Sequence, residues 1–280
     1  MRHYFSAACG LLLVCATALP IQAQEGFQGG LSPEGSLPLL ERRGQGLKPA
    51  APVPAEIAQA EPVLPPLSAA PNPVVVELFT SQGCVSCPPA DAYFAELAKK
   101  PGVIALSLHV DYWDYIGWAD SFGSPAFTER QKTYARAIGS RTIYTPQFVI
   151  AGSDRVEGFE PGEIAAALAA AGSRPPSVRL AVERHGDRLV ILADIDQRPE
   201  AALLVELVRY QPEATVEIER GENAGTVVSY RNIVLSWDRL GEWSGEEHLE
   251  VAVPMTGPEP GVLIVQEPGP GAILAAMVVE

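Results

Sequence analysis

The pattern of hydrophobic and polar positions predicts alternating strands and helices between residues 74 and 171. Short apolar, β-branched runs alternate there with segments whose apolar residues recur at helical spacing. The strand-helix-strand order at the start favours parallel pairing with a right-handed crossover, and the tight turn at 152–154 favours an antiparallel hairpin in the same sheet. The predicted strands cover 74–79, 103–110, 147–151 and 155–159, and the predicted helices cover 88–100, 125–138 and 161–171.

After Arg174-Pro175-Pro176 the pattern changes to short alternating strands without a convincing helix. Turn chemistry at 185–187 and 268–271 separates some of them. This regular spacing predicts a small antiparallel sandwich or barrel over 177–280. The predicted fold class is therefore an α/β domain over 74–173 followed by a small all-β domain. Its strands are expected near 178–184, 188–195, 202–210, 214–219, 226–236, 247–253, 261–266 and 272–279.

The N-terminal residues have the pattern of an export signal. Arg2 precedes an apolar run that Pro20 ends, and Ala23 offers a small residue before a cleavage point. Residues 24–73 are rich in proline and show no hydrophobic periodicity, which is typical of a disordered linker. We therefore expect a signal peptide over 1–23 and a secreted or periplasmic protein, with an uncleaved membrane anchor as the alternative.

Charge and cysteine content restrict the function further. The 280 residues carry a net charge of -14, which argues against nucleic acid or anionic lipid as the main partner. The membrane is expected to be a partner only through an uncleaved signal. Of the four cysteines, two lie in the predicted signal, so the exported chain keeps Cys84 and Cys87 in an oxidising compartment.

These two cysteines form a Cys-x-x-Cys motif between the first predicted strand and the first helix. Backbone N–H groups and the helix dipole at a helix start stabilise a thiolate, the species that attacks in thiol–disulfide exchange. We expect Cys84 to be an accessible, easily ionised thiol. The alternative is a purely structural disulfide, although closing so short a ring contributes only about 2 kcal/mol.

A polar and aromatic cluster follows the second predicted strand. It comprises His109, Asp111, Trp113, Asp114 and Trp118. One interpretation places Trp113 and Trp118 beside the cysteines as a substrate-binding lid, with His109 as a proton carrier or soft-metal ligand. The other, which we favour, is a packed loop with the two aspartates as turn or cap residues. Two cysteines and scattered histidines do not make a zinc site, so no metal site is predicted.

Three segments resemble a known family. VELFTSQGCVSCPPAD, HVDYWDYIGW and GENAGTVVSYRN are similar to segments of DUF1223, a family of secreted bacterial proteins within the thioredoxin-like superfamily. The resemblance implies a thioredoxin-like fold with Cys84 as the attacking thiol and Cys87 as the resolving one. It also implies that Pro146 is a cis-proline that presents the backbone of Thr145 to a substrate strand. The alternative is an ordinary trans proline at the start of an edge strand.

The resemblance further suggests a proton shuttle. Glu77 is the acid expected near the inner cysteine, although its spacing from the motif is one residue longer than usual. The alternative is an acid at the strand end that contacts solvent. The function expected is an exported thiol–disulfide oxidoreductase-like protein that acts on protein or small-molecule thiols and disulfides without a cofactor. The alternatives are a periplasmic copper(I) carrier that uses both thiolates with His109, or a non-catalytic interaction module.

Overall fold

The computed structural model describes residues 72–280. The predicted signal over 1–23 and all but the last two residues of the predicted linker lie outside this range. Within it, no helix has the length and apolar character needed to cross a bilayer.

The first part of the described chain contains the predicted order of strands and helices. Ser124 caps the second helix by accepting a hydrogen bond from the backbone N–H of Ala126, and Pro125 occupies the first helical position. A short 3-10 helix, η1 (Asp114–Ile116), lies in the aromatic loop. The elements are β1 (Val74–Thr80), α1 (Pro88–Leu97), β2 (Val103–His109), α2 (Pro125–Ala137), β3 (Gln147–Ile150), β4 (Asp154–Glu157) and α3 (Pro161–Gly172).

The second part consists of strands alone. They are β5 (Val178–His185), β6 (Arg188–Ile195), β7 (Leu203–Ile218), β8 (Thr226–Trp243), β9 (Leu249–Pro254), β10 (Gly261–Gln266) and β11 (Ile273–Val279). Two strands that the pattern separates, 202–210 and 214–219, are one continuous strand, β7. Pro212 interrupts the hydrophobic pattern there, but it lies beyond the segment paired with β10, where β7 has a free edge that tolerates a proline.

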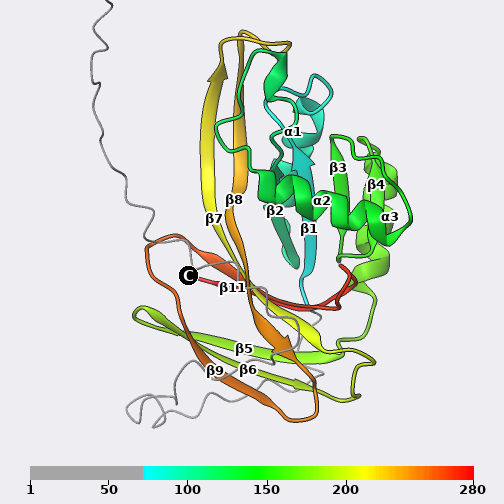
Figure 1. Cartoon of the computed structure of the whole chain (residues 1–280), viewed down its shortest axis with the longest axis vertical. Coiled ribbons are helices and arrows are strands. Elements are labelled where there is room, and N and C mark those ends of the chain that lie inside the picture. The colour runs from blue at the N-terminus through cyan, green and yellow to red at the C-terminus, as the bar shows by residue number, and fades with distance from the viewer. Residues whose placement is uncertain (1–71) are drawn as a thin grey trace, which may run out of the picture. The chain divides into compact units, whose positions relative to one another are not determined.

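The two parts share one large sheet, so the predicted fold class is wrong. An eight-stranded mixed sheet has the order β11-β10-β7-β8-β2-β1-β3-β4, and only β5, β6 and β9 form a second, three-stranded sheet. β8 joins β2 in parallel at Ser107 and Ile233, and Asn232 donates a side-chain hydrogen bond to the carbonyl of Ala105 at 2.9 Å. The chain is therefore not a thioredoxin-like α/β domain followed by a separate all-β domain (Figure 1).

Three apolar cores hold these layers together. α2 packs on one face of the large sheet, with Phe127 and Tyr134 against residues of β1, β2, β8 and β10. On the opposite face, α1 and α3 cover the strands β1 to β4 through Phe94 and Ile164. The three-stranded sheet covers the β7, β8, β10 and β11 end of that face. This packing fixes the C-terminal end of β1, where the cysteine motif begins.

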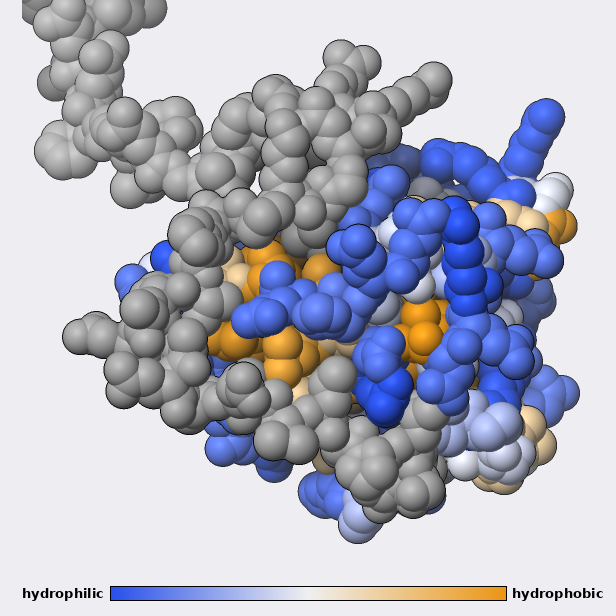
Figure 2. Space-filling view, turned by 90° about the horizontal axis from the view of Figure 1, so that it is seen from below, coloured by the Kyte–Doolittle hydropathy of each residue, from blue (hydrophilic) through white to orange (hydrophobic). Residues whose placement is uncertain are grey.

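Strand β6 of the three-stranded sheet carries apolar residues on both faces. Leu189 and Ile191 belong to the core shared with the large sheet, whereas Val190 and Leu192 alternate with them and point to the other side. Figure 2 views the molecule from the end where β5, β6 and β9 lie, and hydrophobic residues are visible there between hydrophilic ones.

Candidate functional site

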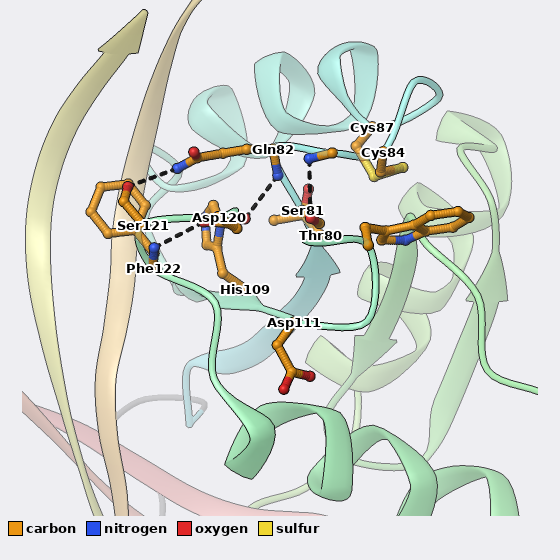
Figure 3. A network of polar contacts seen from close by, with 12 residues as sticks. Thr80, Ser81, Gln82, Cys84, Cys87, His109, Asp111, Asp120, Ser121 and Phe122 are labelled. Atoms are coloured by element: carbon orange, nitrogen blue, oxygen red, sulfur yellow. Dashed lines mark hydrogen bonds and ion pairs between the residues drawn. A yellow bond between two sulfur atoms is a disulfide. The ribbon is translucent and has the colours of Figure 1, made fainter. Parts of the chain in front are cut away.

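The cysteine motif lies in the loop between β1 and α1, hereafter the cysteine loop (residues 81–87). Cys84 and Cys87 form a disulfide with a Cα–Cα distance of 5.4 Å, and Cys87 is the N-cap residue of α1 (Figure 3). Pro88 and Pro89 occupy the first two helical positions, so neither offers a backbone N–H to a thiolate. The helix dipole remains, and the Ser86 hydroxyl lies 3.5 Å from Cys84 Sγ.

Several hydrogen bonds hold the cysteine loop in addition to the disulfide. The Ser81 hydroxyl accepts a hydrogen bond from the backbone N–H of Gly83 at 3.1 Å. The backbone carbonyl of Ser81 accepts one from the backbone N–H of Cys84, also at 3.1 Å. The backbone N–H of Gln82 donates to Asp120 at 2.8 Å. The loop conformation thus has support that does not pass through the sulfur atoms.

The turn between β7 and β8 also contacts this loop. The side-chain amide of Asn223 donates to the backbone carbonyls of Gln82 and Cys84, each at 2.9 Å. Gly221, in the same turn with φ +80°, lies against Trp118. The segment GENAG is therefore the tip of a long hairpin that reaches the cysteine motif from the second half of the chain.

The predicted substrate-binding residues surround the same loop. The indole N–H of Trp113 donates to the Thr145 hydroxyl at 2.7 Å, and that of Trp118 donates to the Gln82 side chain at 2.8 Å. The Thr145–Pro146 peptide bond is cis, as predicted, and Ser86 donates to the carbonyl of Thr145 at 3.4 Å. Both tryptophans remain partly exposed.

A buried polar cluster lies beneath the disulfide. Asp91 and His109 are buried, and Asp91 accepts from the Thr80 hydroxyl at 2.8 Å. His109 Nδ1 lies 2.8 Å from the carboxylate of Asp120, whereas His109 Nε2 has no partner in the described part of the chain. Burial raises the pKa of Asp91 to about 7, opposed by His109 and by the bond from Thr80. Asp91 thus gains or loses a proton near neutral pH.

Asp91 is well placed with respect to the inner cysteine. Its backbone N–H donates to the carbonyl of Cys87 at 3.0 Å, one helical turn earlier. Residues four apart on a helix share a face, so the Asp91 carboxyl lies on the side of α1 that Cys87 faces.

Glu77 does not lie in this cluster, contrary to the predicted role as proton shuttle. It is buried in the middle of β1, where residues alternate between faces, and its neighbours Val76 and Leu78 face α1. The Glu77 carboxylate faces α2 instead, and there accepts from Arg130 at 2.6 and 3.0 Å and from the Tyr134 hydroxyl at 2.5 Å. Glu77 therefore forms a buried structural ion pair with Arg130 on the opposite face of the sheet.

The two loop aspartates have structural contacts, as the favoured interpretation expects. Asp111 accepts from the Thr128 hydroxyl at 2.6 Å, and Asp114 accepts from the backbone N–H of Asp120 at 3.0 Å. Among the described residues there is no group of three His, Cys, Asp or Glu side chains that could hold a metal ion. His109 is fully buried, and its Nδ1 lies against the carboxylate of Asp120.

Sequence reasoning missed Asp91, Asp120 and Asn223 as site residues. Asp91 had a usable signal, because it shares the helical stripe of Phe94 and Leu97, and an acid on a buried stripe is uncommon. The contact of Asn223 with Cys84 had none, since a turn does not reveal which distant loop it meets.

The chain matches a protein family and two solved structures. A family model described as "Protein of unknown function (DUF1223)" matches residues 75–265. The crystal structure of protein AGR_C_4864 from Agrobacterium tumefaciens is similar, with 33% sequence identity over 74% of this chain and 93% of that chain, and a TM-score of 0.63. HBP35 of Porphyromonas gingivalis resembles the present chain in fold alone, with 12% identity over 75% of each chain and a TM-score of 0.53. No curated protein matches. Because the family model covers most of the chain and contains the whole cysteine site, the chain belongs to the DUF1223 family.

Proposed function

We propose that the protein is an exported thiol–disulfide oxidoreductase that exchanges electrons through Cys84 and Cys87. The observation that carries the proposal is the placement of the disulfide at the N-cap of α1, in a loop that other hydrogen bonds already hold. A ring of four residues adds only about 2 kcal/mol of stability. Because the loop keeps its other contacts, the disulfide can open and close without loss of the surrounding structure.

The buried Asp91 supports the proposal because exchange needs a proton at the inner cysteine. A Cys87 thiolate released into a buried site is unfavourable unless it gains a proton. Asp91 has a pKa of about 7 and lies one helical turn from Cys87. It donates a proton to Cys87 when the disulfide is reduced and accepts it when the disulfide forms again.

The balanced step starts from the oxidised protein. A thiolate of the partner attacks Cys84 Sγ, the bond to Cys87 breaks, and Cys87 leaves as a thiolate that takes a proton from Asp91. A second thiolate of the partner then attacks the mixed disulfide and releases Cys84. Two electrons pass from the partner dithiol, which becomes a disulfide, to the Cys84–Cys87 pair.

Access to Cys84 differs from the expectation. Cys84 is only 3% exposed, whereas the neighbouring Val85 is 62% exposed. Attack on Cys84 Sγ therefore requires a local movement that exposes this sulfur, and we expect the oxidised pair to react slowly until a partner induces that movement. Cys84 still has more exposure than Cys87, which has none, and is the sulfur that a partner meets first.

Thiol kinetics test the proposal. In a chain with Cys9 and Cys15 replaced by serine, the reduced protein is expected to reduce DTNB with two thiolates released per chain. Cys87→Ser should release one equivalent and stop at the mixed disulfide, whereas Cys84→Ser should react slowly because its remaining thiol is fully buried. Equal rates for the two variants would remove the assigned roles.

The reduction potential separates exchange from structure. We expect equilibration with glutathione buffers to give a potential within the range of about -270 to -120 mV found for exchange proteins. A potential below about -300 mV would favour a second candidate, a non-catalytic interaction module whose disulfide is structural. The low exposure of Cys84 is the observation that favours this candidate. The copper(I) alternative has no comparable support, because His109 and the two cysteines do not form a group that could hold a metal ion in the described part of the chain.

A further inference from the structure

A second site lies apart from the cysteine loop. A cavity of about 480 Å³ opens between α2 and the strands β7, β8 and β10, and none of its lining residues belongs to the cysteine loop. Phe127, Leu204 and Trp237 supply apolar walls. Small-molecule sites typically have volumes of about 300–1,000 Å³. This cavity lies within that range and combines apolar walls with charged and polar side chains.

The wall of the cavity contains a carboxylate without a hydrogen-bond partner. Glu206 on β7 is 6% exposed, and its Oε2 has no partner in the described part of the chain. The indole N–H of Trp237 is also buried and unpartnered. The N–H of Trp237 is directed at Glu206 and lowers the pKa of its carboxyl group, but the two groups do not meet full hydrogen-bond geometry. A buried carboxylate without hydrogen-bond partners is energetically costly. Its presence in a cavity wall therefore points to a ligand that supplies the missing donor.

The nearby cations do not satisfy this carboxylate. Arg130 gives its hydrogen bonds to Glu77, Tyr134 and Gln266, and its guanidinium stacks 3.4 Å from the centroid of the Trp237 ring. Arg239, across the strand pair from Glu206, bonds instead to Glu242. Burial raises the pKa of Glu206, and Arg130 opposes the rise without contacting the carboxylate.

We propose that this cavity binds a small organic cation. Its ammonium or amidinium head donates to Glu206 Oε2, and its apolar body packs against Phe127, Leu204 and Trp237. A cation is favoured over a neutral or anionic ligand because Glu77 neutralises Arg130, so the charge of Glu206 is the one left without an ion pair.

A series of probes that differ only in head-group charge tests the proposal. The probes are 4-phenylbutylamine, 4-phenylbutanol and 4-phenylbutanoate, titrated calorimetrically into the full-length protein. We expect the amine to bind at least about tenfold more tightly than the alcohol, and the carboxylate to bind no better than the alcohol. Equal affinity for all three probes, or no binding of the amine at millimolar concentration, would overturn the proposal.

Variants assign the effect to the cavity. Glu206→Gln should remove the preference for the amine, whereas Glu217→Gln, an exposed change on the same strand, should keep it. Ala126→Phe places a ring at the exposed rim of the cavity and should weaken binding while leaving the carboxylate in place. If Glu206→Gln fails to fold, this second variant decides: unchanged amine binding would place the ligand elsewhere. None of these changes touches Cys84, so DTNB kinetics should be unaltered.

Discussion

The side-chain amide of Asn223 donates to the backbone carbonyl of Cys84 at 2.9 Å, across 139 positions of sequence. The same amide satisfies the carbonyl of Gln82. The tip of the β7–β8 hairpin therefore holds the cysteine loop from the opposite half of the chain, and the cysteine site is complete only when both halves have folded together.

Replacing Asn223 tests this anchor. Asn223→Ala leaves two carbonyls without their donor in a buried site, so we expect unfolding in urea to show a loss of about 1–3 kcal/mol. The variant should also change the reduction potential of the Cys84–Cys87 pair, because the loop is freed at Cys84. Glu222→Ala, an exposed change in the same turn, is the control. Two variants of equal stability would show that the anchor contributes nothing.

Asp91 should make stability depend on pH. Its pKa is raised from 3.8 to about 7, so the folded state keeps a proton that the unfolded state loses between these values. Stability contributed by this group therefore falls as pH rises from about 4 to about 7. Asp91→Asn should remove this fall, on the order of 4 kcal/mol, in urea titrations at several pH values.

The same variant should alter the chemistry of Cys87. Without a carboxyl one turn from the inner sulfur, the pH profile of disulfide formation should lose the inflection near pH 7. Asp187→Asn, an exposed aspartate in the β5–β6 turn, should leave both stability and the pH profile unchanged. A wild-type pH profile in Asp91→Asn would mean that Cys87 exchanges protons with another group.

The Glu77–Arg130 pair is expected to matter for stability. Arg130→Met leaves the fully buried Glu77 without its cation and should cost about 3–5 kcal/mol in denaturant unfolding. The double variant with Glu77→Gln should recover part of that loss, because no unpaired charge remains. If the stability loss of the double variant equals the sum of the losses of the two single variants, the two residues are not energetically coupled.

Reduction of the disulfide should have a small effect on stability. A four-residue ring restricts the unfolded chain little, so the Cys9→Ser, Cys15→Ser background should lose only about 2 kcal/mol when dithiothreitol is added. Circular dichroism of the reduced protein should show unchanged secondary structure. Unfolding on reduction would instead identify the disulfide as essential to the fold.

Local pattern was sufficient for most individual elements. Helix α2 begins at Pro125 after Ser124 because capping residues determine where a helix starts, and both signals lie within a few neighbouring residues. The parallel pairing of β1 with β2 and the β3–β4 hairpin also follow from connection length. The continuity of β7 through Pro212 did not follow, because whether an edge is free at that residue depends on where β10 ends.

The sequence by itself determined the order of the strands and helices, the cysteine pair at the start of α1 and the family. Only the tertiary structure decided that β8 joins β2 in one sheet, that Asn223 reaches Cys84, and that Glu77 faces Arg130 while Asp91 is buried against Thr80. The physical reason is that periodicity and turn chemistry act over a few residues. Pairing between distant strands and the burial of a particular acid depend instead on contacts that form only when the whole chain packs.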